Sequence, residues 1–188
     1  KYLLGSLVHS TREGKREVLD IVQKNSLATG NHYSIPNEIY KLYDTIPVED
    51  YRSIREIYIQ AFNAPPRNEK WTNQTADAFL YRELDNGATF YIIKVEDACA
   101  GFRIVSPAKH THCKNELWSF GANDKTAYLS AMAIHNNFRG QGLGSELFRY
   151  ALEDIRQDAK YETVMVRCRK DSFTINNIVR KNGFKKIG

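Results

Sequence analysis

Three closely spaced glycines mark the point in this chain where a strand pattern changes into a helix pattern. Residues 126–134 form an apolar run typical of a buried strand, and residues 139–144 read Arg-Gly-Gln-Gly-Leu-Gly. Beyond the turn, apolar side chains recur at helical spacing, at Leu143, Leu147, Phe148, Ala151, Leu152 and Ile155. Backbone N–H groups at a glycine-rich helix start can approach an anion without obstruction by Cβ atoms, which predicts a phosphate-binding turn.

The spacing of the glycines excludes two common phosphate-binding motifs. A P-loop ends in Gly-Lys-Ser/Thr, whereas Gly144 is followed by Ser145 and by Glu146, whose charge would repel phosphate. The dinucleotide fingerprint G-x-G-x-x-G fails as well, because counting from Gly140 places Ser145 at the position of the last glycine.

The turn does match the pattern R/Q-x-x-G-x-G/A, with Arg139, Gly142 and Gly144 at the specified positions. In this motif the sequence resembles the GNAT superfamily of acyl-CoA-dependent N-acetyltransferases. The order of segments over residues 39–188 is also similar to that family. The resemblance implies an α/β fold with a GNAT-like mixed, mostly antiparallel central sheet flanked by helices.

Hydrophobic patterns from residue 39 onward predict the segments in order. They are a strand at 40–46, helices at 48–62 and about 73–84, a β-hairpin at 89–95 and 98–105, a loop at 106–125, a strand at 126–134, the glycine turn with its helix, a strand at 161–168 and a helix at 173–181. Trp71-Thr72-Asn73 offers a cap for the second helix, and Asn182-Gly183 ends the last one.

Residues 1–38 are expected to form an N-terminal extension of a GNAT-like domain at 39–188. The extension contains the apolar stretch Tyr2–Val8 and a helix over about Ser10–Lys24, which opens with a capping-box pattern. Family members usually end with two more strands after the last helix, whereas this chain stops at Gly188. Either the C-terminus is cropped or the N-terminal stretch completes the sheet edge. We favour cropping, because an unfinished edge invites aggregation.

The resemblance implies that the chain binds acetyl-CoA. The pyrophosphate of coenzyme A would lie on the N–H groups of about Gln141 to Ser145, and the pantetheine arm would pair with the main chain of the strand before the turn. The implied cofactor-binding residues are Met132, Ala133, Ile134, Arg139, Gly140, Gln141, Gly142, Leu143, Gly144, Ser145, Ser172 and Asn176. No metal site is predicted, since the three cysteines lack C-x-x-C spacing.

The implied reaction is direct attack of a neutral primary amine on the thioester in a ternary complex. A backbone N–H near Met132–Ile134 is the oxyanion donor that the resemblance implies. The sequence departs from the family pattern at Val179, where a tyrosine often protonates the thiolate, and at Tyr128, where a glutamate often lies. The catalytic candidates are Tyr128, Glu69, Glu116 and His135, and a water relay is a further route for the proton.

Two other functions stay open. Val179 and Tyr128 also fit an acyl-CoA-binding sensor that has lost turnover. A nucleic-acid-binding module would use Lys170, Arg180, Lys181, Lys185 and Lys186. The net charge of +5 arises in residues 139–188, which hold 11 basic and 6 acidic residues. These charges are spread over strand and helix patterns instead of forming one basic arm, so nucleic acid is the less favoured partner.

The remaining expectations concern compartment and partners. Apolar runs are far shorter than the roughly 18–20 residues of a membrane span, so no membrane helix is predicted. The odd number of cysteines and the absence of a signal-peptide pattern favour a cytoplasmic location. The acceptor is expected to be a small-molecule amine or a peptide amine, without a preference between them. A homodimer is an open alternative.

Overall fold

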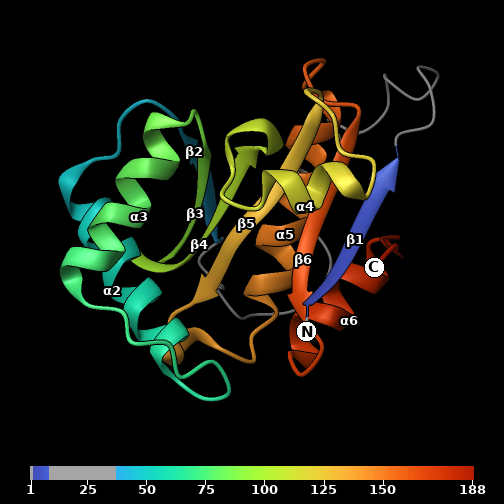
Figure 1. The fold of residues 1–188 in the computed structure, drawn as a ribbon. Helices are drawn as coiled ribbons and strands as arrows, with labels where there is room; N and C mark the ends of the chain where they lie inside the picture. Colours follow the sequence, from blue (N-terminus) through green and yellow to red (C-terminus); the bar gives the residue numbers. More distant parts are fainter. Residues whose placement is uncertain (1, 9–36) are drawn as a thin grey trace, which may run out of the picture.

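The computed structural model describes residues 2–8 and 37–188, which form a seven-stranded sheet flanked by helices (Figure 1). The strands are β1 (Tyr2–Val8), β2 (Glu38–Leu42), β3 (Thr89–Val95), β4 (Ala98–Pro107), β5 (Thr126–Ile134), β6 (Thr163–Arg169) and β7 (Lys185–Lys186). The helices are α2 (Val48–Asn63), α3 (Asn73–Asp85), α4 (Lys114–Ser119), α5 (Leu143–Gln157) and α6 (Phe173–Lys181), with short 3₁₀ turns η1 (Ala108–His110) and η2 (Asn136–Phe138).

The sheet is antiparallel except at one place. Its strand order is β2-β3-β4-β5-β6-β1-β7, and of these neighbours β5 and β6 alone run parallel. The expected mixed, mostly antiparallel α/β fold is therefore confirmed.

Strands β5 and β6 pair over the first part of β5 and then diverge. Their last paired residues are Leu129 and Val166, and Figure 1 shows the strands separating toward the end of β5. The register between β4 and β5 shifts at the same level, so that Ser130 has no partner in β4. A bulge of this kind bends a strand and increases its twist. We call the region beyond the Leu129–Val166 pair the β5–β6 fork.

Helices α2 and α3 cover one face of the sheet. Their apolar sides, which include Ile54, Tyr58 and Leu80, pack on Phe90 and Phe102 of the central strands. These side chains are almost fully buried, so burial of apolar surface accounts for the position of both helices.

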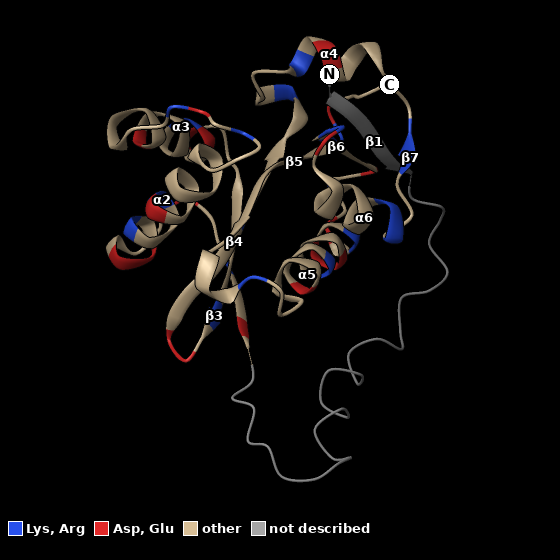
Figure 2. Ribbon diagram, turned by 90° about the horizontal axis from the view of Figure 1, so that it is seen from below, with Lys and Arg blue, Asp and Glu red and all other residues tan. Residues whose placement is uncertain are grey.

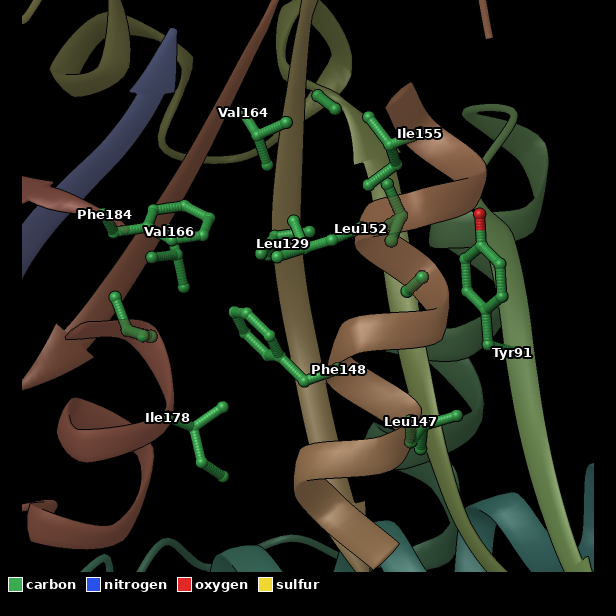
Figure 3. Packing of buried hydrophobic residues seen from close by; sticks show 14 of the residues in the cluster. Tyr91, Leu129, Leu147, Phe148, Leu152, Ile155, Val164, Val166, Ile178 and Phe184 are labelled. Atoms are coloured by element: carbon green, nitrogen blue, oxygen red, sulfur yellow. The ribbon is translucent and has the colours of Figure 1, made fainter. Parts of the chain in front are cut away.

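Helices α5 and α6 cover the opposite face. The stripe predicted for α5 is buried from Leu143 to Ile155, and it packs on Tyr91, Leu129 and Val166. Figure 3 shows Phe148 pointing from α5 toward the fork, where Ile178 of α6 lies nearby.

The segment at 106–125, expected as a loop, contains η1 and α4. Helix α4 has six residues and no capping side chain. It is therefore too short to show a helical periodicity and lacks a cap motif, so the sequence does not predict it. Leu117 is fully buried in a small cluster with Cys113, Tyr128 and Met165, which places α4 on the face opposite α5. Packing therefore holds this helix.

Other element boundaries differ from the expectations by a few residues. Strand β2 ends at Leu42 instead of residue 46, and β6 covers Thr163–Arg169 instead of 161–168. The expected helix at Ser10–Lys24 lies outside the described residues. None of the helices in the described part of the chain is both long and apolar enough to span a bilayer.

The N-terminal stretch takes part in the sheet. Strand β1 pairs along its whole length with β6, from Tyr2 opposite Arg169 to Val8 opposite Thr163, and its other side pairs with β7. The N-terminal stretch therefore contributes a strand at this side of the sheet, and cropping of the C-terminus stays a prediction. The division of the chain at residue 38 stays a prediction.

Candidate functional site

The glycine turn lies between the end of β5 and the start of α5. Gly140 and Gly142 have φ angles of +79° and +83°, a region that L side chains rarely adopt, and a Cβ atom built on either would meet no atom within 4 Å. Arg139 closes the turn, because its Nε donates to the carbonyl oxygen of Ile134 at 3.1 Å. The turn thus presents open backbone to its surroundings.

The first turn of α5 carries N–H groups that are free to bind an anion. The N–H groups of Ser145 and Glu146 both donate to the carbonyl of Gly142, at 2.9 and 3.1 Å. Within the described residues no side chain caps this helix, and no hydrogen bond uses the N–H of Leu143 or Gly144. Such donors, with the positive end of a 15-residue helix behind them, suit a phosphate group.

The carboxylate of Glu146, which could repel a phosphate, has a partner of its own. Its Oε2 accepts a hydrogen bond of 3.1 Å from Nδ2 of Asn37. Figure 2 shows that Lys and Arg residues are frequent on α6 and β7, whereas the turn between β3 and β4 is acidic.

The start of α5 also borders the fork. A Cβ on Gly144 would lie 3.5 Å from Cγ1 of Ile134, 3.9 Å from Cε of Met132 and 4.0 Å from Cδ1 of Ile178. The end of β5, the start of α5 and α6 therefore converge there. Among the described strands none pairs with β5 beyond Leu129 on the side of β6, so backbone groups of the last β5 residues face the fork.

The two expected cofactor residues on α6 have structural contacts. Ser172 is the N-cap of α6, and its side chain makes no capping hydrogen bond. The side-chain amide of Asn176 donates to the carbonyls of Arg169 and Lys170, at 2.9 and 3.3 Å. This amide group therefore stabilises the β6–α6 turn. Val179 is buried in the apolar cluster beneath α5.

Tyr128 and Glu116 come together on the face of the sheet covered by α4. Arg167 of β6 forms an ion pair with Glu116, with 3.3 Å between Nη2 and Oε2, and it acts electrostatically on Tyr128. Burial raises the pKa of Tyr128 far above its ordinary value. Tyr128 is therefore a neutral hydrogen-bonding group at physiological pH.

Glu69 and His135 lie elsewhere. Glu69 belongs to the α2–α3 loop, where it accepts from Nη1 of Arg67 at 3.0 Å and from Nε1 of Trp71 at 2.7 Å. His135 follows β5, and its Nδ1 accepts the N–H of Asn137 at 3.3 Å. The structure therefore divides the four catalytic candidates among three places.

His135 lines a cavity of about 560 Å³ between α2, the β3–β4 turn and the loop after β5. Its lining also contains Glu49, Asp50, Glu56, Lys94 and Asp97. Nζ of Lys94 lies 3.1 Å from Oδ1 of Asp50, which leaves the carboxylates of Glu49, Glu56 and Asp97. The cavity is therefore suited to a cationic group.

His112 is a further candidate, which no sequence pattern indicates. Burial lowers the pKa of His112 from 6.5, and Arg82 and Arg167 lower it further against the effects of Glu83 and Glu116. His112 is thus largely unprotonated at neutral pH and lies near the pair formed by Glu116 and Arg167. No motif surrounds this histidine, so only the folded chain reveals its charged neighbours.

The sheet thus forks between two parallel strands, and a helix start with unpaired N–H groups lies at the mouth of the fork. A model of the acetyltransferase (GNAT) family matches residues 51–184. The match spans more than half of the chain, and the chain belongs to this family.

Known proteins agree with this assignment. The uncharacterized N-acetyltransferase YesJ of Bacillus subtilis (strain 168) is 25% identical over 105 residues, which are 56% of this chain and 57% of the relative. The crystal structure of PH1933 from Pyrococcus horikoshii OT3 is similar with a TM-score of 0.61 at 18% identity, over 81% of this chain and 91% of that one. The ribosomal-protein-S18-alanine N-acetyltransferase from Escherichia coli is similar with a TM-score of 0.57 at 17% identity, over 80% and 78%. At these identities the solved structures show a shared fold.

Proposed function

We propose that this protein transfers an acetyl group from acetyl-CoA to a primary amine by direct attack in a ternary complex. The observation that carries the proposal is the start of α5, where unpaired N–H groups and two glycines with positive φ lie at the mouth of the β5–β6 fork. When bound, acetyl-CoA supplies the activated acyl group.

The chain's own residues have distinct roles in this proposal. The N–H groups of Leu143 and Gly144 bind the pyrophosphate, and Arg139 holds the turn against Ile134. Main-chain groups of β5 beyond Leu129 align the pantetheine arm, and one N–H near Met132–Ile134 donates to the developing oxyanion. Glycine is needed at position 142 because φ is positive there and a side chain would occupy the approach to the phosphate.

The proton of the amine needs an acceptor on the opposite face. Tyr128 is protonated, and Glu69 is held by Arg67 and Trp71. We therefore place His112 first as the base, because its pKa is lowered and it lies near the cluster around Tyr128 and Arg167. A base that is unprotonated at working pH is the efficient choice.

The charge of the cavity beside His135 supports a positively charged acceptor. Glu49, Glu56 and Asp97 line it without a basic partner among its lining residues. The acidic side chains would attract a small cationic amine or a basic peptide end to the protein, and the cavity lies at the end of β4 away from His112.

Coenzyme A binding to two matched glycine variants tests the proposal. Gly142→Val should weaken the affinity measured by calorimetry at least about tenfold, since the valine obstructs the anion-binding turn. Gly87→Val is the control, because Gly87 also has a positive φ of +75° and open space around it but lies in the α3–β3 turn. Wild-type affinity in Gly142→Val, or an equal loss in both variants, would contradict the phosphate site.

Release of free thiol from acetyl-CoA in the presence of an amine panel separates an enzyme from a sensor. The proposal predicts turnover with at least one cationic amine. Binding without turnover across a broad panel would favour the acyl-CoA sensor. Retention of DNA or RNA that falls steeply with salt would favour the nucleic-acid-binding module instead.

A further inference from the structure

Arg103 is a buried cation on β4, next to β5. It is 2% exposed, and its partner in the β4–β5 register is Met132. Its guanidinium carbon lies 5.0 Å from the centre of the Phe148 ring, and its charge acts on Cys168 of β6. Since Phe148 points toward the fork (Figure 3) and Cys168 belongs to β6, these two neighbours place the guanidinium on the side of the fork.

This cation has no anion to balance it within the described residues. Its Nε and Nη2 are buried and have no hydrogen-bond partner. The titratable groups that act on it are Cys168, Tyr128 and Tyr91. Burial raises the pKa of Cys168 to about 11 and raises the pKa of both tyrosines, so all three are neutral at pH 7.

Burial also lowers the pKa of Arg103, to about 10, which leaves the guanidinium charged at neutral pH. An unpaired charge in a protein interior costs several kcal/mol, and natural proteins rarely retain one without a partner. A ligand that brings or develops negative charge would supply that partner. The fork is where such a ligand would meet Arg103.

The position along β5 matches the reactive end of the proposed ligand. From Ile134, beside the phosphate-binding turn, to Leu129, where the fork closes, β5 extends about 16 Å at ~3.3 Å per residue. Arg103 lies opposite Met132 on this stretch, and Phe148, on which it stacks, belongs to the same apolar cluster as Val179. Val179 cannot donate a proton to a leaving sulfur. The groups next to such a sulfur would be the apolar side chain of Val179 on α6 and the cation of Arg103 on β4.

We propose that the guanidinium of Arg103 holds the sulfur of the departing coenzyme A as a thiolate. This inference rests on the acetyl-CoA site proposed above. The amine nitrogen forms the new C–N bond, the C–S bond breaks with its electron pair on sulfur, and the amine proton passes to the base. Arg103 stabilises the resulting sulfur anion by charge and hydrogen bonding, without donating a proton.

The pKa of the thiol in bound coenzyme A tests this role without turnover. The ultraviolet absorbance of the thiolate is followed against pH in the coenzyme A complex, with the acetyl-CoA complex, which has no free thiol, as the baseline. Cys168→Ala serves as the background so that this protein thiol does not contribute. A cation at hydrogen-bonding distance should lower the pKa of the bound thiol by roughly 1–3 units relative to free coenzyme A.

Two variants identify Arg103 as the cause. Arg103→Met, an apolar side chain of similar length, should abolish the shift, and Arg103→Lys should retain part of it. A role limited to stacking on Phe148 would change the stability of the variants but leave the thiol pKa where it is in the wild-type protein. The wild-type measurement stands even if a variant does not fold.

The outcomes separate this inference from the proposed function. Binding of coenzyme A with an unshifted thiol pKa, or with a shift that persists in Arg103→Met, would overturn the role of Arg103 and leave the acetyl-CoA site intact. Failure of the wild-type protein to bind coenzyme A would overturn both. A shift that is lost in Arg103→Met and partly kept in Arg103→Lys would establish the contact.

Discussion

Burial decides which chemistry Tyr128 can perform. The residue has 4% of its surface exposed on β5, and its pKa lies far above 10 because the charged form would be poorly solvated. A phenol in that state can donate a hydrogen bond but cannot take a proton from an ammonium group. The strand pattern and the family resemblance indicate this position in the sequence. Its degree of burial depends on α4, which no sequence pattern predicts.

His112 should determine the acidic limb of the pH–rate profile. Because a base acts in its unprotonated form and the pKa of His112 is lowered from 6.5, kcat/KM should be at its plateau at pH 7 and fall as the pH drops through a value below 6.5. His112→Gln should remove this limb and lower kcat/KM by roughly 10²–10⁴-fold. The measurement is kcat/KM for the best amine between pH 5 and pH 8.

His110→Gln is the matched control for this prediction. His110 lies in the same connection, at the end of η1. Its replacement should leave the profile unchanged. A wild-type profile in His112→Gln would assign the proton transfer to another group or to water.

At the scale of the element, periodicity and capping predicted the long helices well. The apolar stripe of α5 and the Thr72 cap of α3 are encoded in neighbouring residues, so they can be read from the sequence. Helix α4 and the β5–β6 fork arise from contacts between distant segments. The bulge at Ser130 and the end of pairing at Leu129 leave no local signal in the sequence. The glycine turn at the mouth of the candidate site was therefore predicted, whereas the fork behind it was not.

The cap of α3 allows a stability prediction with an internal control. Thr72 and Thr75 form a reciprocal capping box, in which the Thr72 hydroxyl accepts from the N–H of Thr75 at 3.3 Å and the Thr75 hydroxyl accepts from the N–H of Thr72 at 2.9 Å. Thr72→Ala should lower the free energy of unfolding by about 1 kcal/mol in a urea titration. Ser172→Ala, at an N-cap whose side chain makes no capping bond, should change it by much less.

At the scale of the molecule, the order of the strands could not be predicted from local patterns. Tyr2–Val8 was identified as apolar, and pairing with the sheet edge was one of two alternatives. The pairing of this stretch depends on whether β6 has a free edge next to it, which is a property of the assembled sheet. The same holds for Arg103, whose lack of an anion can be seen only when all of its neighbours are in place.

Hydrogen exchange of the unmodified protein tests the place of β1. A strand that pairs on one side with β6 and on the other with β7 should have amide protons that exchange slowly in its centre, at Leu4 to Ser6. Protection there should approach that of β6 and exceed that of β2, which pairs only with β3 among the described strands. Exchange at the rate of an exposed peptide would contradict this arrangement.

Because β1 lies between β6 and β7, its neighbours in the sheet are not its neighbours in the sequence. In sequence, β1 is followed by β2, which lies at the opposite edge of the sheet, whereas its contacts are with the last two strands. If the covalent link between β1 and β2 were cut, Tyr2–Val8 should therefore stay bound to the rest of the chain through its backbone ladders with β6 and β7. A synthetic peptide containing Tyr2–Val8 should then compete for that position and exchange with the cleaved strand.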